Sequence, residues 1–113
     1  MGRAFSHWDA RGHWLSWKLN VPTAGKYMLV LRYCSPVTVQ RQIEIDGGTP
    51  RLQGFPGTGG FGGPENEWGH FVVRDPKQFW LGFDLTAGEH TIKLTNVDGR
   101  GMNLDYLALV AMK

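Results

Sequence analysis

The sequence lacks the features that usually stabilise a small protein covalently or place it in a membrane. Its 113 residues include one cysteine, Cys34, which excludes an internal disulfide. Because Cys34 lies in an apolar, strand-like run, we expect a buried, unreactive thiol. No apolar run approaches the length of about 18 residues that a transmembrane helix needs, and the first residues lack the basic and apolar regions of a signal peptide. We therefore expect a hydrophobic core to provide the stability.

Charge is also sparse. Charged residues make up 19% of the chain and the net charge is +2, which is too small to indicate nucleic acid or an anionic membrane as a partner. Hydrophobic residues make up 42%, as in soluble globular proteins. A chain of this length can bury roughly two-thirds of its unfolded surface. We predict a single domain over residues 1–113.

Arrangements typical of catalysis are missing as well. The four histidines lack the close spacing of a zinc site, and no serine lies in a nucleophile-elbow motif. Glu65 and Glu67 lie in one loop beside Trp68, whereas a glycosidase needs two carboxyl groups across a cleft. We predict that the protein is not an enzyme.

What the chain does contain is alternation of apolar and polar side chains, which indicates half-buried strands. Residues 78–85 are an example, because Phe79, Leu81, Phe83 and Leu85 would face the core and Trp80 would face away. The run 26–34 is apolar on both faces, as in a central strand. The runs that we predict as strands are 14–21, 26–34, 37–46, 71–73, 78–85 and the two halves of 90–110.

Residues 90–110 are predicted to form a closing hairpin around the turn at 98–101. Beyond this turn, Asn103, Asp105 and Tyr106 interrupt an apolar strand, although we expect the ring of Tyr106 to join the core. Buried polar groups cost free energy unless they are paired. This cluster therefore either meets solvent at a sheet edge or binds something.

The segment 49–69 is rich in glycine and proline and is predicted to be a long loop. No periodicity of helical length is present. Short strands separated by Gly and Pro turns predict an all-β sandwich.

Four segments in order resemble a known group of proteins. They are Trp14-Leu-Ser-Trp-Lys-Leu-Asn-Val-Pro-Thr-Ala-Gly-Lys-Tyr, Leu31-Arg-Tyr-Cys, Phe83-Asp-Leu-Thr-Ala-Gly-Glu-His-Thr-Ile-Lys-Leu and Asn103-Leu-Asp-Tyr-Leu. Over residues 12–110 the chain resembles carbohydrate-binding modules of families 6 and 35. The resemblance implies a galactose-binding-like jelly-roll β-sandwich. It also implies non-catalytic binding of a polysaccharide or a terminal sugar, a role in targeting an associated glycan-active enzyme, and a secreted or periplasmic location.

The resemblance also implies site residues at the loop end of the sandwich. Asn103 matches an asparagine that binds a sugar hydroxyl, and Trp80 matches an aromatic platform. A second platform is expected from Trp8 or Trp68. Asp105 matches an acidic position that helps to hold a structural calcium ion (Ca²⁺) in many members.

Two departures from the family qualify these expectations. The usual first strand, which carries other acidic calcium ligands, is missing, since the first acidic residue of this chain is Asp9. One sheet edge would then be uncovered, and we expect another copy of the chain or another part of a parent protein to pair with it. The second departure is the Gly-rich segment 49–69, which would reshape the binding cleft.

Each site residue also has a structural interpretation. Trp80 could pack under the 49–69 segment, and Trp8 or Trp68 could anchor a loop. Asn103 could stabilise the preceding turn. Asp105 could pair with Arg32 or Arg41, or face solvent. The alternative function is a structural or interaction β-sandwich that binds no sugar, with its tryptophans buried or placed in a protein interface.

Overall fold

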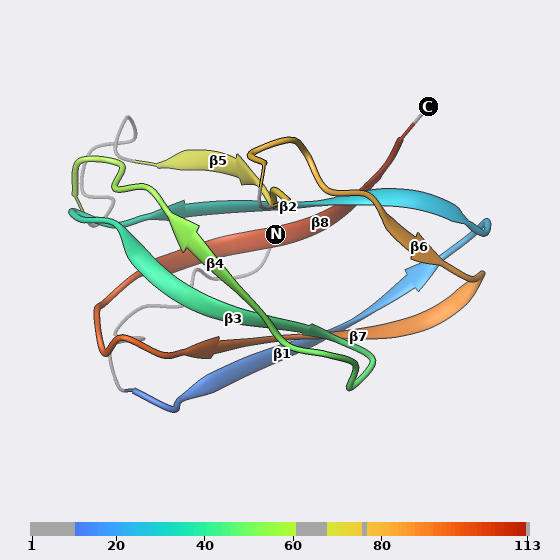
Figure 1. Ribbon diagram of the computed structural model, residues 1–113, viewed down its shortest axis with the longest axis horizontal. Coiled ribbons are helices and arrows are strands. Elements are labelled where there is room, and N and C mark those ends of the chain that lie inside the picture. Colours follow the sequence, from blue (N-terminus) through green and yellow to red (C-terminus); the bar gives the residue numbers. More distant parts are fainter. Residues whose placement is uncertain (1–10, 61–67, 76, 113) are drawn as a thin grey trace.

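The computed structural model describes residues 11–60, 68–75 and 77–112, which form a sandwich of two antiparallel sheets (Figure 1). The β7 sheet has the strand order β1-β7-β3-β4. In the β2 sheet, β2 lies between β8 on one side and β5 and β6 on the other. The strands are β1 Trp14–Val21, β2 Gly25–Cys34, β3 Val39–Ile45, β4 Arg51–Phe55, β5 Gly69–Val72, β6 Phe83–Leu85, β7 Gly88–Asn96 and β8 Asn103–Ala111.

The predicted all-β sandwich is confirmed. The alternation in 14–21 gives a strand with those bounds, and the doubly apolar run 26–34 is the central strand β2. No helix that is long and apolar enough to cross a membrane occurs in the described part of the chain.

The core lies between the two sheets and follows the period of two along each strand. On β2, Leu29, Leu31 and Tyr33 face inward and are buried, and Ile92 and Leu94 face them from β7. Three aromatic rings fill one end of the core in edge-to-face contacts, with ring centroids 5.5 Å apart for Tyr33–Phe55 and 5.2 Å for Phe55–Phe71. The free thiol of Cys34 is buried, as predicted.

The predicted strand over 78–85 is wrong in its first half, since only Phe83–Leu85 is a strand. Asp75 Oδ1 accepts hydrogen bonds from the backbone N–H groups of Lys77 and Phe79, at 2.9 and 3.0 Å, and closes a tight turn. Phe79, predicted to face the core, is 67% exposed at this turn. The turn and its flanks form a hairpin that projects from the sandwich, in which Arg74 pairs with Trp80.

The predicted loop over 49–69 is wrong in part, because β4 lies within it and pairs with β3. The predicted closing hairpin is also wrong. Strands β7 and β8 belong to different sheets, since β7 pairs with β1 and β3 whereas β8 pairs with β2. Residues 97–102 are therefore an arch that crosses from one sheet to the other.

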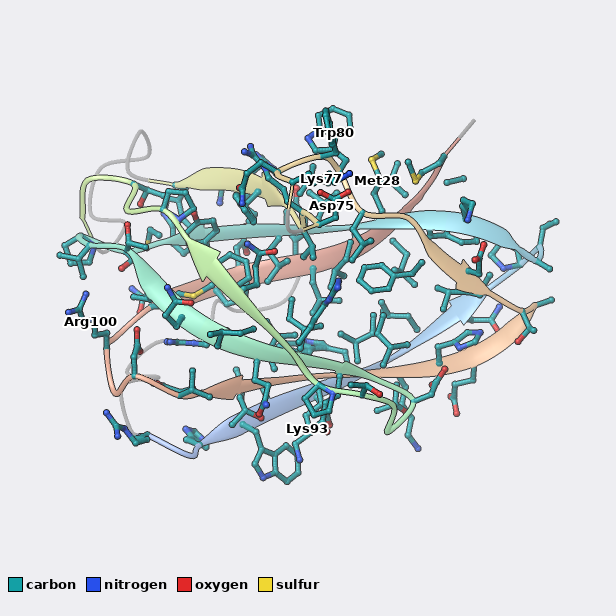
Figure 2. The ribbon with its side chains drawn as sticks, viewed as in Figure 1. Met28, Asp75, Lys77, Trp80, Lys93 and Arg100 are labelled. Carbon is teal, nitrogen blue, oxygen red and sulfur yellow. The ribbon has the colours of Figure 1, made fainter. Side chains whose placement is uncertain are left out.

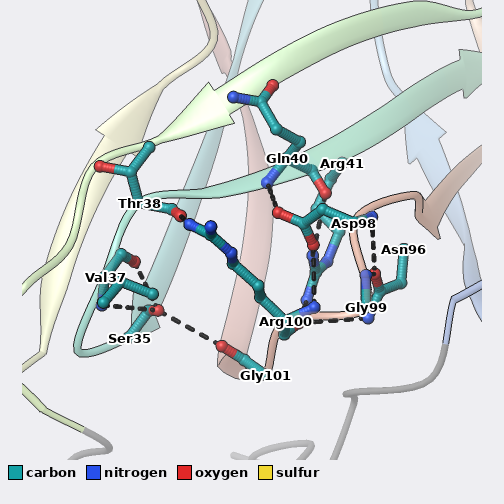
Figure 3. A network of polar contacts seen from close by, with 10 residues as sticks. All are labelled: Ser35, Val37, Thr38, Gln40, Arg41, Asn96, Asp98, Gly99, Arg100 and Gly101. Atoms are coloured by element: carbon teal, nitrogen blue, oxygen red, sulfur yellow. Dashed lines mark hydrogen bonds and ion pairs between the residues drawn. The ribbon is translucent and has the colours of Figure 1, made fainter.

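A polar network holds this arch (Figure 3). Asp98 accepts hydrogen bonds from the backbone N–H groups of Gln40 at 2.7 Å and Arg100 at 3.0 Å. Arg41, whose side chain is fully buried, donates to the carbonyl oxygen of Arg100 at 2.9 Å and lies 3.3 Å from Asp98 Oδ1. Burial lowers the pKa of Arg41 to about 10, and the charge of Asp98 partly opposes this. The guanidinium therefore stays protonated at neutral pH.

Candidate functional site

A group of polar and aromatic side chains lies on the outer face of the β2 sheet. Its centre is Arg32, which faces outward because its neighbours Leu31 and Tyr33 are buried in the core. Arg32 Nη1 lies 2.8 Å from Asp105 Oδ2, and both side chains are mostly buried. On the other side, the guanidinium lies 5.0 Å from the ring centroid of Trp68. Arg32 is therefore held between a carboxylate and an aromatic ring.

A β-bulge brings two consecutive residues of β8 to this face. Tyr33 lies opposite Leu104 and Arg32 lies opposite Tyr106, so Asp105 is the extra residue between them. Leu104 remains in the core, whereas Asp105 contacts Arg32. Without the bulge, adjacent residues would alternate between the two faces.

The neighbouring strand β5 adds His70, which lies opposite Arg32 on β2. His70 Nε2 is 2.7 Å from the hydroxyl oxygen of Tyr106, and the two rings are tilted with centroids 5.8 Å apart. The expectation that Tyr106 joins the core is therefore wrong, because its hydroxyl takes part in an exposed contact. Residues Arg32, Trp68, His70, Asp105 and Tyr106 are called the Arg32 cluster below.

Two of the predicted site residues, Trp68 and Asn103, flank the end of β2 on opposite sides. Trp68 directly precedes Gly69, which lies opposite Tyr33, and Asn103 lies opposite Cys34 from the other side. Since adjacent strands are about 4.8 Å apart, the backbones of Trp68 and Asn103 are roughly 10 Å apart. Both residues are half-buried.

The structure places Trp80 elsewhere. Trp80 is 58% exposed and pairs with Arg74 in the projecting hairpin, whose preceding residue Val73 donates its N–H to Leu29 of β2. Leu29 is five residues from Cys34, so Trp80 lies roughly 17 Å along the sheet from Asn103. Figure 2 shows Trp80 above the β2 sheet with Asp75 and Lys77 of the same hairpin beside it. Trp8 lies outside the described residues.

Calcium binding by Asp105 stays a prediction, and one of its carboxylate oxygens is paired with Arg32. Calcium takes six to eight oxygen ligands, whereas a guanidinium nitrogen lies 2.8 Å from one oxygen of Asp105. Over residues 11–60, 68–75 and 77–112, no group of three or more His, Cys, Asp or Glu side chains could hold a metal ion. The pairing with Arg32 is the structural alternative for Asp105.

Sequence reasoning missed most of the Arg32 cluster. Arg32 was foreseen only as a partner of Asp105, and neither His70 nor the hydroxyl of Tyr106 was assigned to a site. The outward position of Arg32 between two apolar neighbours was the available signal. His70 and Tyr106 depend on strand register and on the bulge, for which the sequence has no local signal.

Comparisons with known proteins agree with the fold. No family model and no curated protein matches the sequence. Among solved structures, a cycloisomaltooligosaccharide glucanotransferase of Paenibacillus sp., complexed with cycloisomaltoheptaose, matches with a TM-score of 0.72 and 26% identity over 91% of this chain and 14% of that one. A family 35 carbohydrate-binding module of Clostridium thermocellum matches with a TM-score of 0.69 and 22% identity, covering 91% of this chain and 73% of that one.

A β-(1,4)-mannanase of Podospora anserina that includes a family 35 module matches with a TM-score of 0.74 and 17% identity, covering 100% of this chain and 22% of that one. The chain therefore spans only a small part of both enzymes. These likenesses confirm the resemblance at the level of fold, since the structural neighbours include family 35 modules with the same β-sandwich.

Proposed function

We propose that the protein is a non-catalytic carbohydrate-binding module whose site lies at the end of β2. The observation that carries this proposal is the convergence of Trp68 and Asn103 beside the Arg32 cluster. The shared fold with family 35 modules supports it. The ligand would be a polysaccharide or a terminal sugar.

The side chains at this place match what sugar binding requires. Arg32 covers one side of the Trp68 ring, and the axial C–H groups of a pyranose would stack on the exposed part. The Asn103 amide and the His70–Tyr106 pair would exchange hydrogen bonds with hydroxyl groups. Because each such bond replaces one with water, it contributes only about 1 kcal/mol. We expect millimolar to micromolar affinity, about −4 to −8 kcal/mol.

Weak binding of this kind is useful when the module is attached to, or associates with, a glycan-active enzyme. The gain then comes from the raised effective concentration of the substrate. The mannanase named above combines an enzyme with a family 35 module, which supports this partner. A secreted or periplasmic location accords with such a role.

A panel of plant, algal and animal glycans tests the proposal, with binding measured by tryptophan fluorescence and affinity gels, with and without calcium. Trp68→Ala should weaken binding about tenfold or more, because stacking and burial are lost together. Asn103→Ala should weaken it about fivefold, the equivalent of one hydrogen bond. Trp14→Ala is the matched control, since Trp14 is exposed on the β7 sheet beside Lys93.

Three outcomes would change the proposal. Unchanged affinity in Trp68→Ala with loss in Trp80→Ala would move the site to the projecting hairpin. No response to any glycan would favour the alternative, an accessory domain whose exposed Phe79 and Trp80 contact a protein. Release of reducing sugar by the pure protein would show an enzyme.

The edge of β8 carries a second part of the proposal. Within the described residues, β8 pairs only with β2, so its other edge has no partner strand there. Unpaired edges favour addition of another strand. We expect a second copy of the chain, or a segment of a parent protein, to pair with it. A strict monomer at high concentration in sedimentation velocity would contradict self-association.

A further inference from the structure

A side opening between the sheets lies away from the Arg32 cluster. It is bordered by β4, the edge strand of the β7 sheet, and by the residues that lead into β6 (Figure 1). The opening has two adjoining hollows, and Arg51 lines both of them. One is a mainly apolar cavity of about 410 Å³, and the other is a polar pocket of about 250 Å³.

The apolar cavity is walled by core side chains from both sheets. Ile43 and Ile45 of β3 line it from one sheet, and Phe83 of β6 and Leu81, which precedes β6, line it from the other side. Its volume lies within the range of small-molecule sites, roughly 300–1,000 Å³. Arg51 is the only charged residue among those that line it.

The polar pocket holds two arginines for which the described part of the chain supplies no acceptor. Arg51 and Arg74 are both half-buried, and neither guanidinium makes a hydrogen bond or ion pair with another described residue. Arg74 Nε is fully buried without a hydrogen-bond partner among the described residues, and the guanidinium carbon lies 5.1 Å from the centroid of the Phe71 ring. Withdrawing guanidinium groups from water without an acceptor is costly. An anion in the pocket would offset this cost.

Two of the other polar side chains of the pocket, those of Asp75 and Gln53, already make hydrogen bonds within the protein. Among the described residues that line the pocket, Asp75 alone carries a carboxylate, and its Oδ1 accepts the two backbone hydrogen bonds that close the 75–79 turn. Gln53 accepts from the Arg74 N–H at 3.1 Å and donates to the Gly54 carbonyl oxygen at 2.9 Å. Two guanidinium groups therefore face one carboxylate, and the pocket keeps a net positive charge.

We propose that this opening binds a small organic carboxylate with an apolar body. The carboxylate lies in the polar pocket between Arg51 and Arg74, and the apolar body enters the cavity beside Leu81 and Phe83. A guanidinium presents two parallel N–H donors that match the two carboxylate oxygens. Because Arg51 lines both hollows, one ligand can occupy the polar pocket and the apolar cavity at the same time. This site is independent of the proposed carbohydrate site.

The test titrates the full chain with octanoate and follows binding by calorimetry and by amide chemical shifts. Acetate, which has only the charge, and 1-octanol, which has only the chain, are the comparison probes. Octanoate should bind about tenfold more tightly than either, because each probe retains one half of the interaction. The largest shifts should fall at Arg51, Arg74, Leu81 and Phe83.

Variants then separate this site from non-specific binding. Arg51→Gln and Arg74→Gln should each weaken octanoate binding about tenfold, since a charge-assisted hydrogen-bonded pair is lost. Lys18→Gln removes an exposed cation from β1 and should change binding less than about twofold. Arg51→Lys, which keeps the charge, should retain part of the affinity and checks that the fold tolerates a change there.

Several results would overturn the proposal. These are equal binding in Arg51→Gln and Lys18→Gln, equal affinity for acetate and octanoate, shifts confined to the Arg32 cluster, or no saturable binding up to about 10 mM octanoate, which is near −3 kcal/mol. Glycan binding by the same variants is measured in parallel. Its presence or absence bears on the carbohydrate proposal alone, because the two sites share no residue.

Discussion

The arginines of two regions, the arch and the side opening, differ in the acceptors that surround them. At the arch between β7 and β8, Arg41 is completely buried and its guanidinium donates to the carbonyl oxygens of Gln40 and Arg100 while facing the Asp98 carboxylate. At the side opening, Arg51 and Arg74 are half-buried and find no acceptor among the described residues. The Nε atom is buried without a hydrogen-bond partner among the described residues in both Arg41 and Arg74, so the difference lies in the terminal nitrogens, which have acceptors in Arg41.

This difference indicates that Arg41 stabilises the fold, whereas Arg51 and Arg74 are available to bind a ligand. A buried charge whose hydrogen-bond acceptors and counterion lie inside the protein fixes one conformation, here the crossing between the two sheets. A half-buried charge without a partner retains binding capacity for a ligand. The two groups should therefore respond in opposite ways to substitution, with stability affected at the arch and ligand binding affected at the opening.

The largest expected effect comes from Arg41→Met. The change removes the counterion of Asp98 and the guanidinium donor to two carbonyl oxygens, and removing one partner of a buried ion pair typically costs about 3–5 kcal/mol. Urea denaturation should show this loss as a lower midpoint. Arg51→Met is the matched control and should change the free energy of unfolding by less than about 0.5 kcal/mol. Equal losses of unfolding free energy in Arg41→Met and Arg51→Met would show that the two arginines do not differ in their contribution to stability.

The carboxylates of the two regions allow a second comparison. Asp98→Ala removes the acceptor for two backbone N–H groups and the counterion of Arg41, so we expect a loss of about 2–3 kcal/mol. Asp75→Ala removes only the acceptor for the Lys77 and Phe79 N–H groups in an exposed turn, and should cost about 1 kcal/mol. Thermal unfolding measures both. A larger loss in Asp75→Ala would show that the hairpin, rather than the arch, dominates stability.

Much of the fold could be predicted from the sequence because burial of one face imposes a period of two. Residues 14–21 follow that period and are a strand, and the predicted strand 37–46 is observed over Val39–Ile45. The run 26–34, apolar on both faces, lies in the central strand β2. The same pattern misled at Phe79, where the turn closed by Asp75 exposes a residue in a core-like position. Strand β4 was missed because its surroundings are rich in Gly and Pro, although its partner β3 supplies the pairing. The alternation of side chains along a strand shows which face is buried, but it does not show which strand is the pairing partner.

The predictions of the closing hairpin and of the site residues were incomplete for the same reason. Hairpins and arches have similar sequences, and only the choice of partner strand distinguishes them. The sequence indicated Trp68 and Asn103, which the structure brings together, and Trp80, which it places farther along the sheet. Arg32 and His70 became neighbours through strand register, which is a non-local property.

A third ion pair, between His90 and Asp46, should make stability depend on pH near neutrality and can be compared with the pair at the arch. His90 Nδ1 lies 2.6 Å from Asp46 Oδ2. This contact raises the pKa of His90, to which the carbonyl oxygen of Thr86 adds, and it lowers the pKa of Asp46, to which a hydrogen bond from the Thr91 N–H adds. The stabilisation from His90 is full below its unfolded value of about 6.5 and is lost as the pH rises through the higher folded value. The stabilisation from Asp46 is lost as the pH falls below about 3.9 and through its lower folded value.

Stability should therefore decline above about pH 6.5, and His90→Gln should flatten this decline. The effect should be smaller than those at the arch, because Asp46 is exposed and its charge is screened. Urea midpoints at several pH values measure it. The pair at the arch is different, because Arg41 has a pKa of about 10. Burial raises the pKa of Asp98, but hydrogen bonds from Arg100 and Gln40 and the charge of Arg41 together lower it by more, so it lies below its usual value. A similar decline in both wild type and His90→Gln would assign the pH response to another group.

The smallest expected effects concern backbone conformation at the two turns. Gly99 in the arch has φ of 73° and Gln78 in the projecting hairpin has φ of 71°, so both lie in the left-handed region. Gly99→Ala meets only the Cβ of Arg11, at 4.0 Å, and should cost about 1 kcal/mol from the backbone alone.

Gln78→Gly should do the reverse and stabilise the protein by about 0.5 kcal/mol, because relief of the left-handed backbone exceeds the added entropy of the unfolded chain. Thermal unfolding measures the gain, with Gly99→Ala as the opposite control. Gln78 also lines the polar pocket beside Arg51 and Arg74. Strained residues persist where the side chain has a use, so the stabilised Gln78→Gly variant should also bind octanoate more weakly. A gain in stability with unchanged binding would show that this strain has no connection with the opening.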